Sequence, residues 1–252
     1  MKIPNFKFEK ELWRKDYRLV AGIDEVGRGA WAGPLVAAAT IFRSSLQGSA
    51  FLQGLALKYF KARPYGTYGK IRDSKQLSPL QRERLDPFIK KNCLAYSIAE
   101  ISVKIINREG IAKATQRAFR KCSKSLKPQA DFVLVDAFPV KYLAGKDQKP
   151  IVKGDQKSLS IAAASIIAKV YRDNLMRKLH EKNGRYSFDK NKGYGTKLHQ
   201  ELIRKHGISK DHRINFVPNH LLGKRSNTKK SPRKAIATMP DLDFKKKQGQ
   251  NH

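Results

Sequence analysis

Two adjacent carboxylates, Asp24 and Glu25, stand immediately before a turn that contains Gly27, Arg28 and Gly29. The apolar residues that precede them predict a short strand over 17–25, so both acids lie at the end of a strand. Carboxylate oxygens suit a hard divalent cation, and glycine lets backbone N–H groups approach a phosphate or a sugar closely. This spacing therefore predicts metal-dependent chemistry at a phosphodiester, as in a nuclease.

Two further acids occupy similar places in the chain. Asp136 ends the apolar run 132–136, and Asp155 follows Gly154 just before a long predicted helix. An aspartate at the end of a strand in an α/β sheet usually points toward the crevice where ligands bind. Each acid alone is weak evidence, because an aspartate that caps a helix or a turn is commoner than a ligand, and this applies to Asp155 in particular.

If these acids converge, their repulsion would leave one of them protonated unless a cation neutralises the cluster. Mg²⁺ is usually held by one or two carboxylates together with substrate phosphates. Two such ions roughly 3.5–4 Å apart can activate water and stabilise the leaving oxygen of a phosphodiester. Because successive strand residues face opposite sides of a sheet, we expect either that the strand breaks at Glu25 or that Glu25 acts through a water molecule.

The charge of the chain indicates a polyanionic partner. Lys and Arg number 53 against 21 Asp and Glu, which gives a formal net charge of +32. The segment 221–252 carries +7 of this, so +25 remains on the rest of the chain. A folded body this basic repels itself unless a polyanion is near, which favours nucleic acid. The charge alone fits a non-catalytic nucleic-acid-binding protein equally well.

Other bulk features narrow the class of protein. No apolar run approaches the roughly 18 residues that a membrane span needs, and residues 1–15 lack the apolar core of a secretory signal. Cys93 and Cys122 show no CxxC or Cys/His spacing, so neither zinc nor a disulfide framework is indicated. We therefore expect a cytoplasmic protein with reduced thiols and no contact with a membrane.

Apolar periodicity and turn residues predict alternating strands and helices. The predicted strands are 17–25, 35–42, 93–105, 131–136 and 149–153, and the predicted helices are 47–60, 79–91, 107–126, 159–182 and 197–206. This order implies an α/β layer structure with a mixed sheet. We expect 1–16 to be an N-terminal lead-in, 17–220 to be one catalytic domain, and 221–252 to be a disordered basic tail.

Seven sequence motifs, in order along residues 22–216, resemble those of the ribonuclease HII family, the type 2 ribonucleases H. They are GIDEVGRGAWAGP (22–34), RDSKQLS (72–78), INREGIAKATQRA (106–118), VLVDA (133–137), VKGDQKSLSIAAASIIAKVYRD (152–173), NKGYGTKLH (191–199) and DHRINF (211–216). One such motif could arise by chance, whereas seven in the same order are a specific signature.

The resemblance implies an RNase H-like fold, with a five-stranded mixed sheet flanked by helices and a small helical C-terminal extension. It implies Mg²⁺- or Mn²⁺-dependent endonucleolytic cleavage of RNA in RNA–DNA hybrids and on the 5′ side of a ribonucleotide embedded in duplex DNA. The products would be a 3′-hydroxyl and a 5′-phosphate. Such an enzyme is expected to be a monomer whose substrates are hybrids and ribonucleotide-containing duplexes.

The resemblance also assigns residues to roles. The four acids of the family's active site correspond to Asp24, Glu25, Asp136 and Asp155. The Gly-Arg-Gly element that contacts the ribose 2′-hydroxyl and the adjacent phosphate corresponds to residues 27–29. The tyrosine that senses the RNA-to-DNA junction corresponds to Tyr194, which the sequence by itself would present only as a loop aromatic.

Several other polar residues lie inside these motifs. Lys75 is either a phosphate contact or a solvated side chain, and Asp73 beside it is expected to orient the loop. Asp173 is expected to form an ion pair on a helix surface. We expect His199 and His212 to be structural or to flank the substrate, because a two-metal site needs no histidine base.

The chain departs from the family pattern in two places. Many bacterial members carry glycine after the third acid, where Ala137 stands here, and this small change should leave the metal site intact. Segment 44–70 is longer than expected and is either an extended substrate-binding loop or a surface helix and turn. Two alternatives to the full activity stay open: a binding protein that has lost turnover, and a nuclease that needs several consecutive ribonucleotides.

Overall fold

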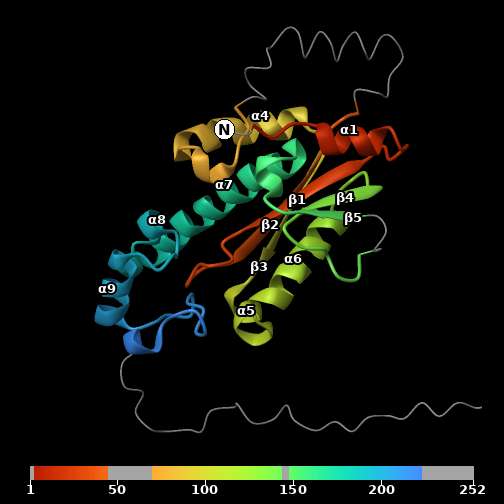
Figure 1. The fold of residues 1–252 in the computed structure, drawn as a ribbon. Helices are drawn as coiled ribbons and strands as arrows, with labels where there is room; N and C mark the ends of the chain where they lie inside the picture. Colours follow the sequence, from red (N-terminus) through yellow and green to blue (C-terminus); the bar gives the residue numbers. More distant parts are fainter. Residues whose placement is uncertain (1–2, 45–69, 144–147, 223–252) are drawn as a thin grey trace, which may run out of the picture.

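The computed structural model describes residues 3–44, 70–143 and 148–222 (Figure 1). The helix predicted over 47–60, the long segment between the first two motifs and the basic tail from residue 223 onward lie outside the described residues. No helix within the described ranges is long and apolar enough to cross a membrane.

A five-stranded mixed sheet forms the centre of the molecule. Its strands are β1 (Val20–Val26), β2 (Leu35–Ile41), β3 (Ala95–Ile101), β4 (Phe132–Asp136) and β5 (Gln148–Ile151). They lie in the order β3-β2-β1-β4-β5. The β1–β2 and β2–β3 pairs are antiparallel, whereas β1–β4 and β4–β5 are parallel. The sheet confirms the predicted fold class.

One face of the sheet is covered by α5 (Val103–Glu109) and α6 (Ile111–Lys124). The sequence predicted a strand up to residue 105 and then a single helix over 107–126, and both boundaries were wrong. Ser102 accepts a hydrogen bond from the N–H of Ile105 and so begins a helix directly after β3. Gly110, with a φ of 79°, then separates the two helices.

The opposite face packs against α7 (Leu159–Lys182), and α4 (Pro79–Asn92) packs against α7 in turn. Helix α7 approaches the sheet closely because Gly22 has no side chain: a Cβ there would lie 2.3 Å from the backbone N of Ile161. The buried alanines 162–164 continue this close packing. Gly22 of β1 and the alanines of α7 together therefore allow the short distance between α7 and β1.

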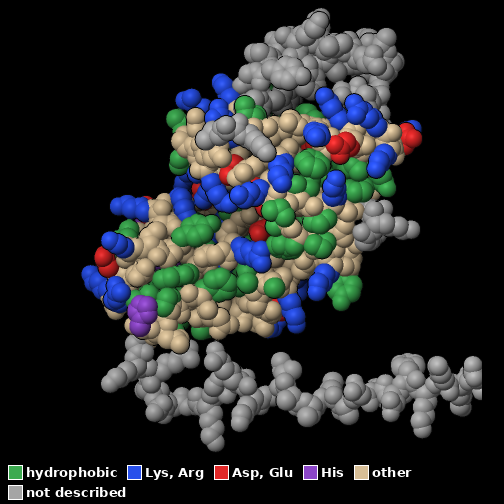
Figure 2. All heavy atoms as spheres, viewed as in Figure 1, with side chains coloured by type: hydrophobic (Ala, Val, Ile, Leu, Met, Phe, Trp, Pro, Cys, Tyr) green, Lys and Arg blue, Asp and Glu red, His purple; other side chains and the backbone are tan. Residues whose placement is uncertain are grey.

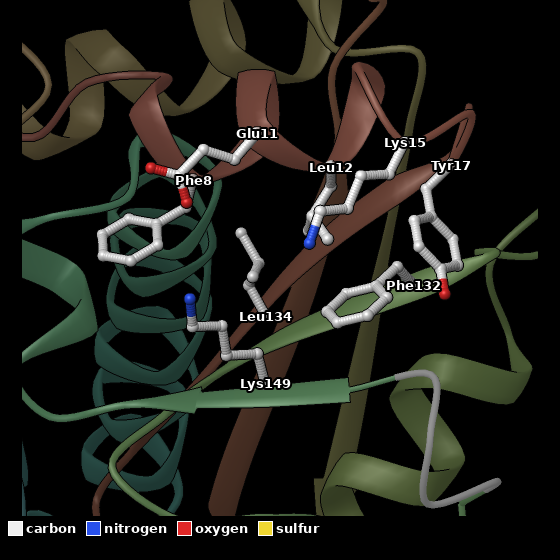
Figure 3. A pocket seen from close by; sticks show the side chains of 8 residues that line it. All are labelled: Phe8, Glu11, Leu12, Lys15, Tyr17, Phe132, Leu134 and Lys149. Carbon is white, nitrogen blue, oxygen red and sulfur yellow. The ribbon is translucent and has the colours of Figure 1, made fainter.

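The predicted N-terminal lead-in contains a helix that the sequence analysis missed, α1 (Lys7–Trp13). Its buried Glu9 accepts hydrogen bonds from the Ser158 hydroxyl (2.6 Å) and the Ser160 N–H (3.0 Å) at the start of α7. Beside α1 lies a cavity of about 220 Å³ whose lining includes Phe8 and Phe132 (Figure 3). None of the predicted site residues lines this cavity.

The C-terminal part extends beyond the sheet along the second half of α7. It contains α8 (Phe188–Asn191) and α9 (Lys197–His206) (Figure 1). The short 3₁₀ turns of the fold are η1 (Ser74–Gln76), η2 (Gly154–Gln156), η3 (Gly184–Tyr186) and η4 (Asn219–Leu221). A separate apolar cluster, which includes Met176 and Phe188, joins this part to Ala32 in the loop after β1. The helical C-terminal extension is thus packed directly against the segment that follows Asp24 and Glu25.

Candidate active site

Asp24 and Asp136 occupy neighbouring positions on two parallel strands, Asp24 two residues before the end of β1 and Asp136 at the end of β4. The β1–β4 register pairs Ile23 with Val135, so the next residue on each strand is one of the two acids. Asp24 is buried, and its Oδ1 accepts a hydrogen bond from the backbone N–H of Glu25 (2.7 Å). Burial, together with the charges of Glu25, Asp136 and Asp155, raises the pKa of Asp24 well above its usual value.

Glu25 lies on the other side of the strand. The predicted break does not occur at this residue, because β1 continues regularly to Val26. Burial raises the pKa of Glu25 to about 7; Arg28 acts against this rise and the charge of Asp136 adds to it. The Oε2 atom of Glu25 is buried and has no hydrogen-bond partner among the described residues. This carboxylate therefore has an oxygen left for a ligand that the protein itself does not supply.

Asp155 lies in η2, between β5 and α7. Ser158, and not Asp155, caps α7, since its side chain accepts a hydrogen bond from the N–H of Ile161. Burial raises the pKa of Asp155 to about 6, with further contributions from the negative charges of Asp73 and Asp136. The helix-cap alternative for Asp155 is therefore excluded, and its carboxylate lies within electrostatic range of the other acids.

The turn that carries Asp73 and Lys75 precedes α4 and lies next to the acidic cluster. Asp73 accepts hydrogen bonds from the N–H of Lys75 (2.9 Å) and from the side chain of Gln156 (3.1 Å). It thus orients its loop, as predicted, and also ties that loop to η2. The exposed Lys75 contributes a positive charge that lowers the pKa of both Glu25 and Asp155. On the face shown in Figure 2, acidic side chains near the centre are bordered by Lys and Arg side chains.

The carboxylate oxygens of this cluster suit a divalent cation. Oxygens of the substrate would complete the coordination of that cation. Within the described part of the chain, no group of three or more His, Cys, Asp or Glu side chains could hold a metal ion by itself. The cluster does provide hard oxygen donors, a buried unpaired oxygen on Glu25 and carboxylates whose raised pKa values a cation would lower. Mg²⁺ sites built from one or two carboxylates plus phosphates have this character.

The two glycines of the Gly-Arg-Gly turn differ in what a side chain at their position would meet. Gly27 has a φ of 90°, and a Cβ there would lie 2.1 Å from Nε of Arg172. A Cβ on Gly29 would meet no atom within 4 Å. Arg28 stands between them in the sequence, and its guanidinium lies 4.8 Å from the ring centroid of Phe138. Gly27 is therefore needed for folding of the turn, whereas Gly29 leaves open space that a substrate could enter.

Tyr194 lies in the loop between α8 and α9, beside the segment that follows the turn. The carbonyl of Gly193 accepts hydrogen bonds from the N–H groups of Trp31 (2.8 Å) and Ala32 (3.1 Å). The half-buried Tyr194 ring has the Arg172 guanidinium 5.4 Å from its centroid. The structure thus brings the tyrosine loop and the Gly-Arg-Gly segment together, although they are about 165 residues apart in the chain.

His199 and His212 form a buried hydrogen-bonded pair, with their Nε2 atoms 3.1 Å apart. His199 Nδ1 must donate to the carbonyl of Tyr194 (2.9 Å), so its Nε2 accepts from His212. His212 Nδ1 is then free to accept from the N–H of Ser209 (2.9 Å). Both rings are therefore neutral, and their role is structural.

Asp173 differs from its prediction, and two buried arginines near the site were not predicted at all. Asp173 forms its ion pairs, with Lys169 (2.7 Å) and Arg82 (3.8 Å), in a buried position and not on a helix surface. Arg172 and Arg213 are fully buried and bind backbone carbonyls, which the sequence analysis did not anticipate. A buried arginine cannot be recognised from sequence when its acceptors are carbonyls of distant segments.

Comparisons with known proteins agree with this architecture. The family model described as Ribonuclease HII matches residues 21–219. The chain is 42% identical over 206 residues to Ribonuclease HII of Clostridium perfringens (strain SM101 / Type A), covering 82% of this chain and 69% of that protein. It is 40% identical over 216 residues to Ribonuclease HII of Caldicellulosiruptor bescii, covering 86% and 95% of the two chains.

A solved structure shows the same fold. The crystal structure of ribonuclease H2 from Pyrococcus horikoshii OT3 matches with a TM-score of 0.59 and 26% identity, covering 78% of this chain and 93% of that one. The family match over most of the chain, the two relatives and the shared fold give one conclusion. This chain belongs to the ribonuclease HII family and is a nuclease.

Proposed function

We propose that this protein is a metal-dependent endoribonuclease that cleaves RNA in RNA–DNA hybrids and on the 5′ side of a ribonucleotide embedded in duplex DNA. The products would carry a 3′-hydroxyl and a 5′-phosphate. The observation that carries this proposal is the adjacency of Asp24 and Asp136 on parallel strands. The charges of Glu25 and Asp155 are near enough to raise the pKa of Asp24, and the Gly-Arg-Gly turn follows next along the chain.

Asp24, Asp136 and Asp155 would hold Mg²⁺ or Mn²⁺ together with oxygens of the substrate, and Glu25, on the other side of the unbroken strand, would act on the cation through a water molecule. When bound, the cation supplies an activated water and stabilises charge on the phosphodiester oxygens. The protein contributes a fixed set of carboxylates: the N–H of Gly154 donates to Asp136 Oδ1 (2.7 Å), and the N–H of Glu25 donates to Asp24 Oδ1 (2.7 Å). These bonds keep the carboxylate oxygens oriented before substrate arrives.

Recognition of the ribonucleotide is assigned to the Gly-Arg-Gly turn and Tyr194. Only the 2′-hydroxyl distinguishes RNA from DNA at a single nucleotide, so a backbone group must come close enough to hydrogen-bond it. The open space at Gly29 supports such an approach. Arg28, half exposed, can pair with the adjacent phosphate, and Tyr194 would lie against the sugar of the next nucleotide and exclude a second 2′-hydroxyl there.

The test is a cleavage assay on end-labelled DNA duplexes of one sequence that contain zero, one or four consecutive ribonucleotides, each with Mg²⁺, Mn²⁺ or EDTA. We expect metal-dependent nicking of the duplex with one ribonucleotide, on its 5′ side, and no cut in all-DNA. Tight binding without any cut would identify a non-catalytic binding protein. Cleavage restricted to four ribonucleotides would identify a nuclease that needs a longer hybrid.

A further inference from the structure

Arg213 lies behind the Gly-Arg-Gly turn and donates to the carbonyl groups of its backbone. Its Nη1 lies 2.6 Å from the carbonyl oxygen of Gly27, 3.2 Å from that of Arg28 and 2.9 Å from that of Ala30. Its Nε donates to Gly33 at 2.9 Å. The side chain is completely buried, so it cannot itself touch a substrate.

Arg172 holds the next part of the same segment. Its guanidinium donates to the carbonyls of Pro34 (2.9 Å), Ala32 (3.1 Å) and Lys192 (3.0 Å). In the described ranges neither Arg172 nor Arg213 forms an ion pair with a carboxylate. Two buried positive charges therefore bind the backbone of segment 27–34, and no carboxylate in that part of the structure competes for them.

The direction of these carbonyls fixes the direction of the N–H groups. In a trans peptide the C=O of one residue and the N–H of the next point to opposite sides. Since the carbonyls of Gly27 and Arg28 point inward to Arg213, the N–H groups of Arg28 and Gly29 point outward. Neither N–H donates to a backbone carbonyl within the described structure, and the space beside Gly29 is open.

We propose that Arg213 is a positioning residue for ribonucleotide recognition: it turns the carbonyls of the turn inward and so presents the N–H groups of Arg28 and Gly29 to the ribose hydroxyl and its neighbouring phosphate. This inference rests on the proposed function. Burial, with the nearby charge of Arg172, lowers the pKa of Arg213 to about 9, which leaves it charged at neutral pH. Its charge then adds to the attraction of these two donors for a phosphate.

Lysine cannot replace Arg213 in this role. The ammonium group of lysine is a single point with three donors, whereas the guanidinium spans the distance between the carbonyls of Gly27 and Gly33 with separate nitrogens. Arg213→Lys keeps the charge but releases some of these carbonyls. Ile203→Ala is a matched control, because Ile203 is buried in the neighbouring C-terminal cluster and no hydrogen bond of the turn involves it.

The experiment measures Kd in EDTA for two duplexes of one sequence, all-DNA and DNA with one ribonucleotide. The preference is the ratio of the Kd for all-DNA to the Kd for the ribonucleotide duplex. We expect Arg213→Lys to lower this ratio by at least about tenfold while its Kd for all-DNA stays within about twofold of wild type. Ile203→Ala should keep the preference. An unchanged preference in Arg213→Lys, or an equal loss of affinity for both duplexes, would overturn the inference.

A second measurement uses the wild-type protein, in case Arg213→Lys does not fold. In ¹⁵N-labelled protein, the amide signals of Arg28 and Gly29 should shift with the ribonucleotide duplex more than with all-DNA. Equal shifts with both duplexes contradict the role assigned to these donors. If wild type shows no preference between the duplexes, the role assigned to Arg213 is overturned. Failure of the proposed function would appear instead as absence of metal-dependent cleavage by wild type, which is a separate result.

Discussion

Asp136 accepts a hydrogen bond from the backbone N–H of Gly154, at 2.7 Å from its Oδ1. This bond ties the end of β4 to the turn that carries Asp155, so two acids from separate segments are held in one arrangement. A Cβ on Gly154 would lie 2.6 Å from Ile161 Cδ1 and 3.2 Å from Asp136 Oδ1. The geometry of the acidic cluster therefore depends on the absence of a side chain at residue 154.

Gly154→Ala should consequently reduce cleavage by at least about tenfold, because the added methyl group displaces η2 and the Asp136 carboxylate relative to each other. Cleavage rates at saturating substrate, with thermal unfolding in parallel, check this. Gly184→Ala is the matched control: its Cβ would have His180 Cε1, at 3.7 Å, as its one neighbour within 4 Å. Equal activity in both variants would show that η2 does not position the acids.

Gly27→Ala should mainly lower the stability of the fold, whereas Gly29→Ala should mainly weaken recognition of the ribonucleotide. Gly27→Ala combines a positive φ with a collision against Arg172, so we expect a loss of more than about 2 kcal/mol of unfolding free energy. Gly29→Ala should change the unfolding free energy by less than about 0.5 kcal/mol and weaken binding of the ribonucleotide duplex. Urea unfolding and Kd measurements test this; the reverse pattern would contradict the assignment of open space at Gly29.

Ala137→Gly should stabilise the protein. Ala137 has a φ of 62°, a left-handed conformation that costs an alanine about 1–2 kcal/mol and a glycine little. Glycine also has greater conformational freedom in the unfolded chain, which offsets part of the relief of strain. The net gain in unfolding free energy is therefore up to about 1 kcal/mol. Ala112→Gly on the exposed face of α6 is the control and should destabilise. If Ala137→Gly destabilises as much as Ala112→Gly, the backbone at residue 137 is not strained.

The histidine pair should make stability depend on pH. Burial, with the nearby His199, lowers the pKa of His212 from 6.5 to about 4. Between these values the unfolded chain binds a proton that the folded chain does not, so the unfolding free energy falls as pH falls from 6.5 toward 4. At pH 5 the loss attributable to His212 is about 2 kcal/mol.

His212→Asn isolates this contribution from the carboxylates that titrate in the same range. The difference in unfolding free energy between wild type and His212→Asn should shrink by about 2 kcal/mol between pH 7.5 and pH 5. Urea unfolding at the two pH values measures it. Parallel pH profiles would show that His212 takes up a proton as readily in the folded protein as in the unfolded chain.

The sequence predicted the periodic elements well and the long-range packing poorly. Helices α7 and α9 begin and end where apolar periodicity placed them. Asp136 ends β4 as predicted, whereas β1 continues two residues beyond Asp24, to Val26. The break at Gly110 was missed, since a single glycine within a helical pattern is often tolerated. Helix α1 was missed because its seven residues give too short a periodic signal.

The acids of the candidate site could be identified from sequence, whereas the residues that hold the recognition loops could not. Asp24, Glu25, Asp136 and Asp155 occur at strand ends and turns, positions with a local signal. Arg172 and Arg213 act on carbonyls about 140 and 180 residues away in the chain, and nothing in the neighbouring sequence reveals such partners. Polar networks of this kind become visible only once the segments have been brought together.

The central claim, that the clustered acids act through a bound cation, is tested most directly by Asp136→Asn on the duplex with one ribonucleotide. With Mg²⁺ or Mn²⁺ present, the account predicts loss of cleavage by more than about a thousandfold and equal or tighter binding, because one negative charge near the phosphate is removed. Full cleavage by Asp136→Asn, or metal-independent cleavage by wild type, would contradict it.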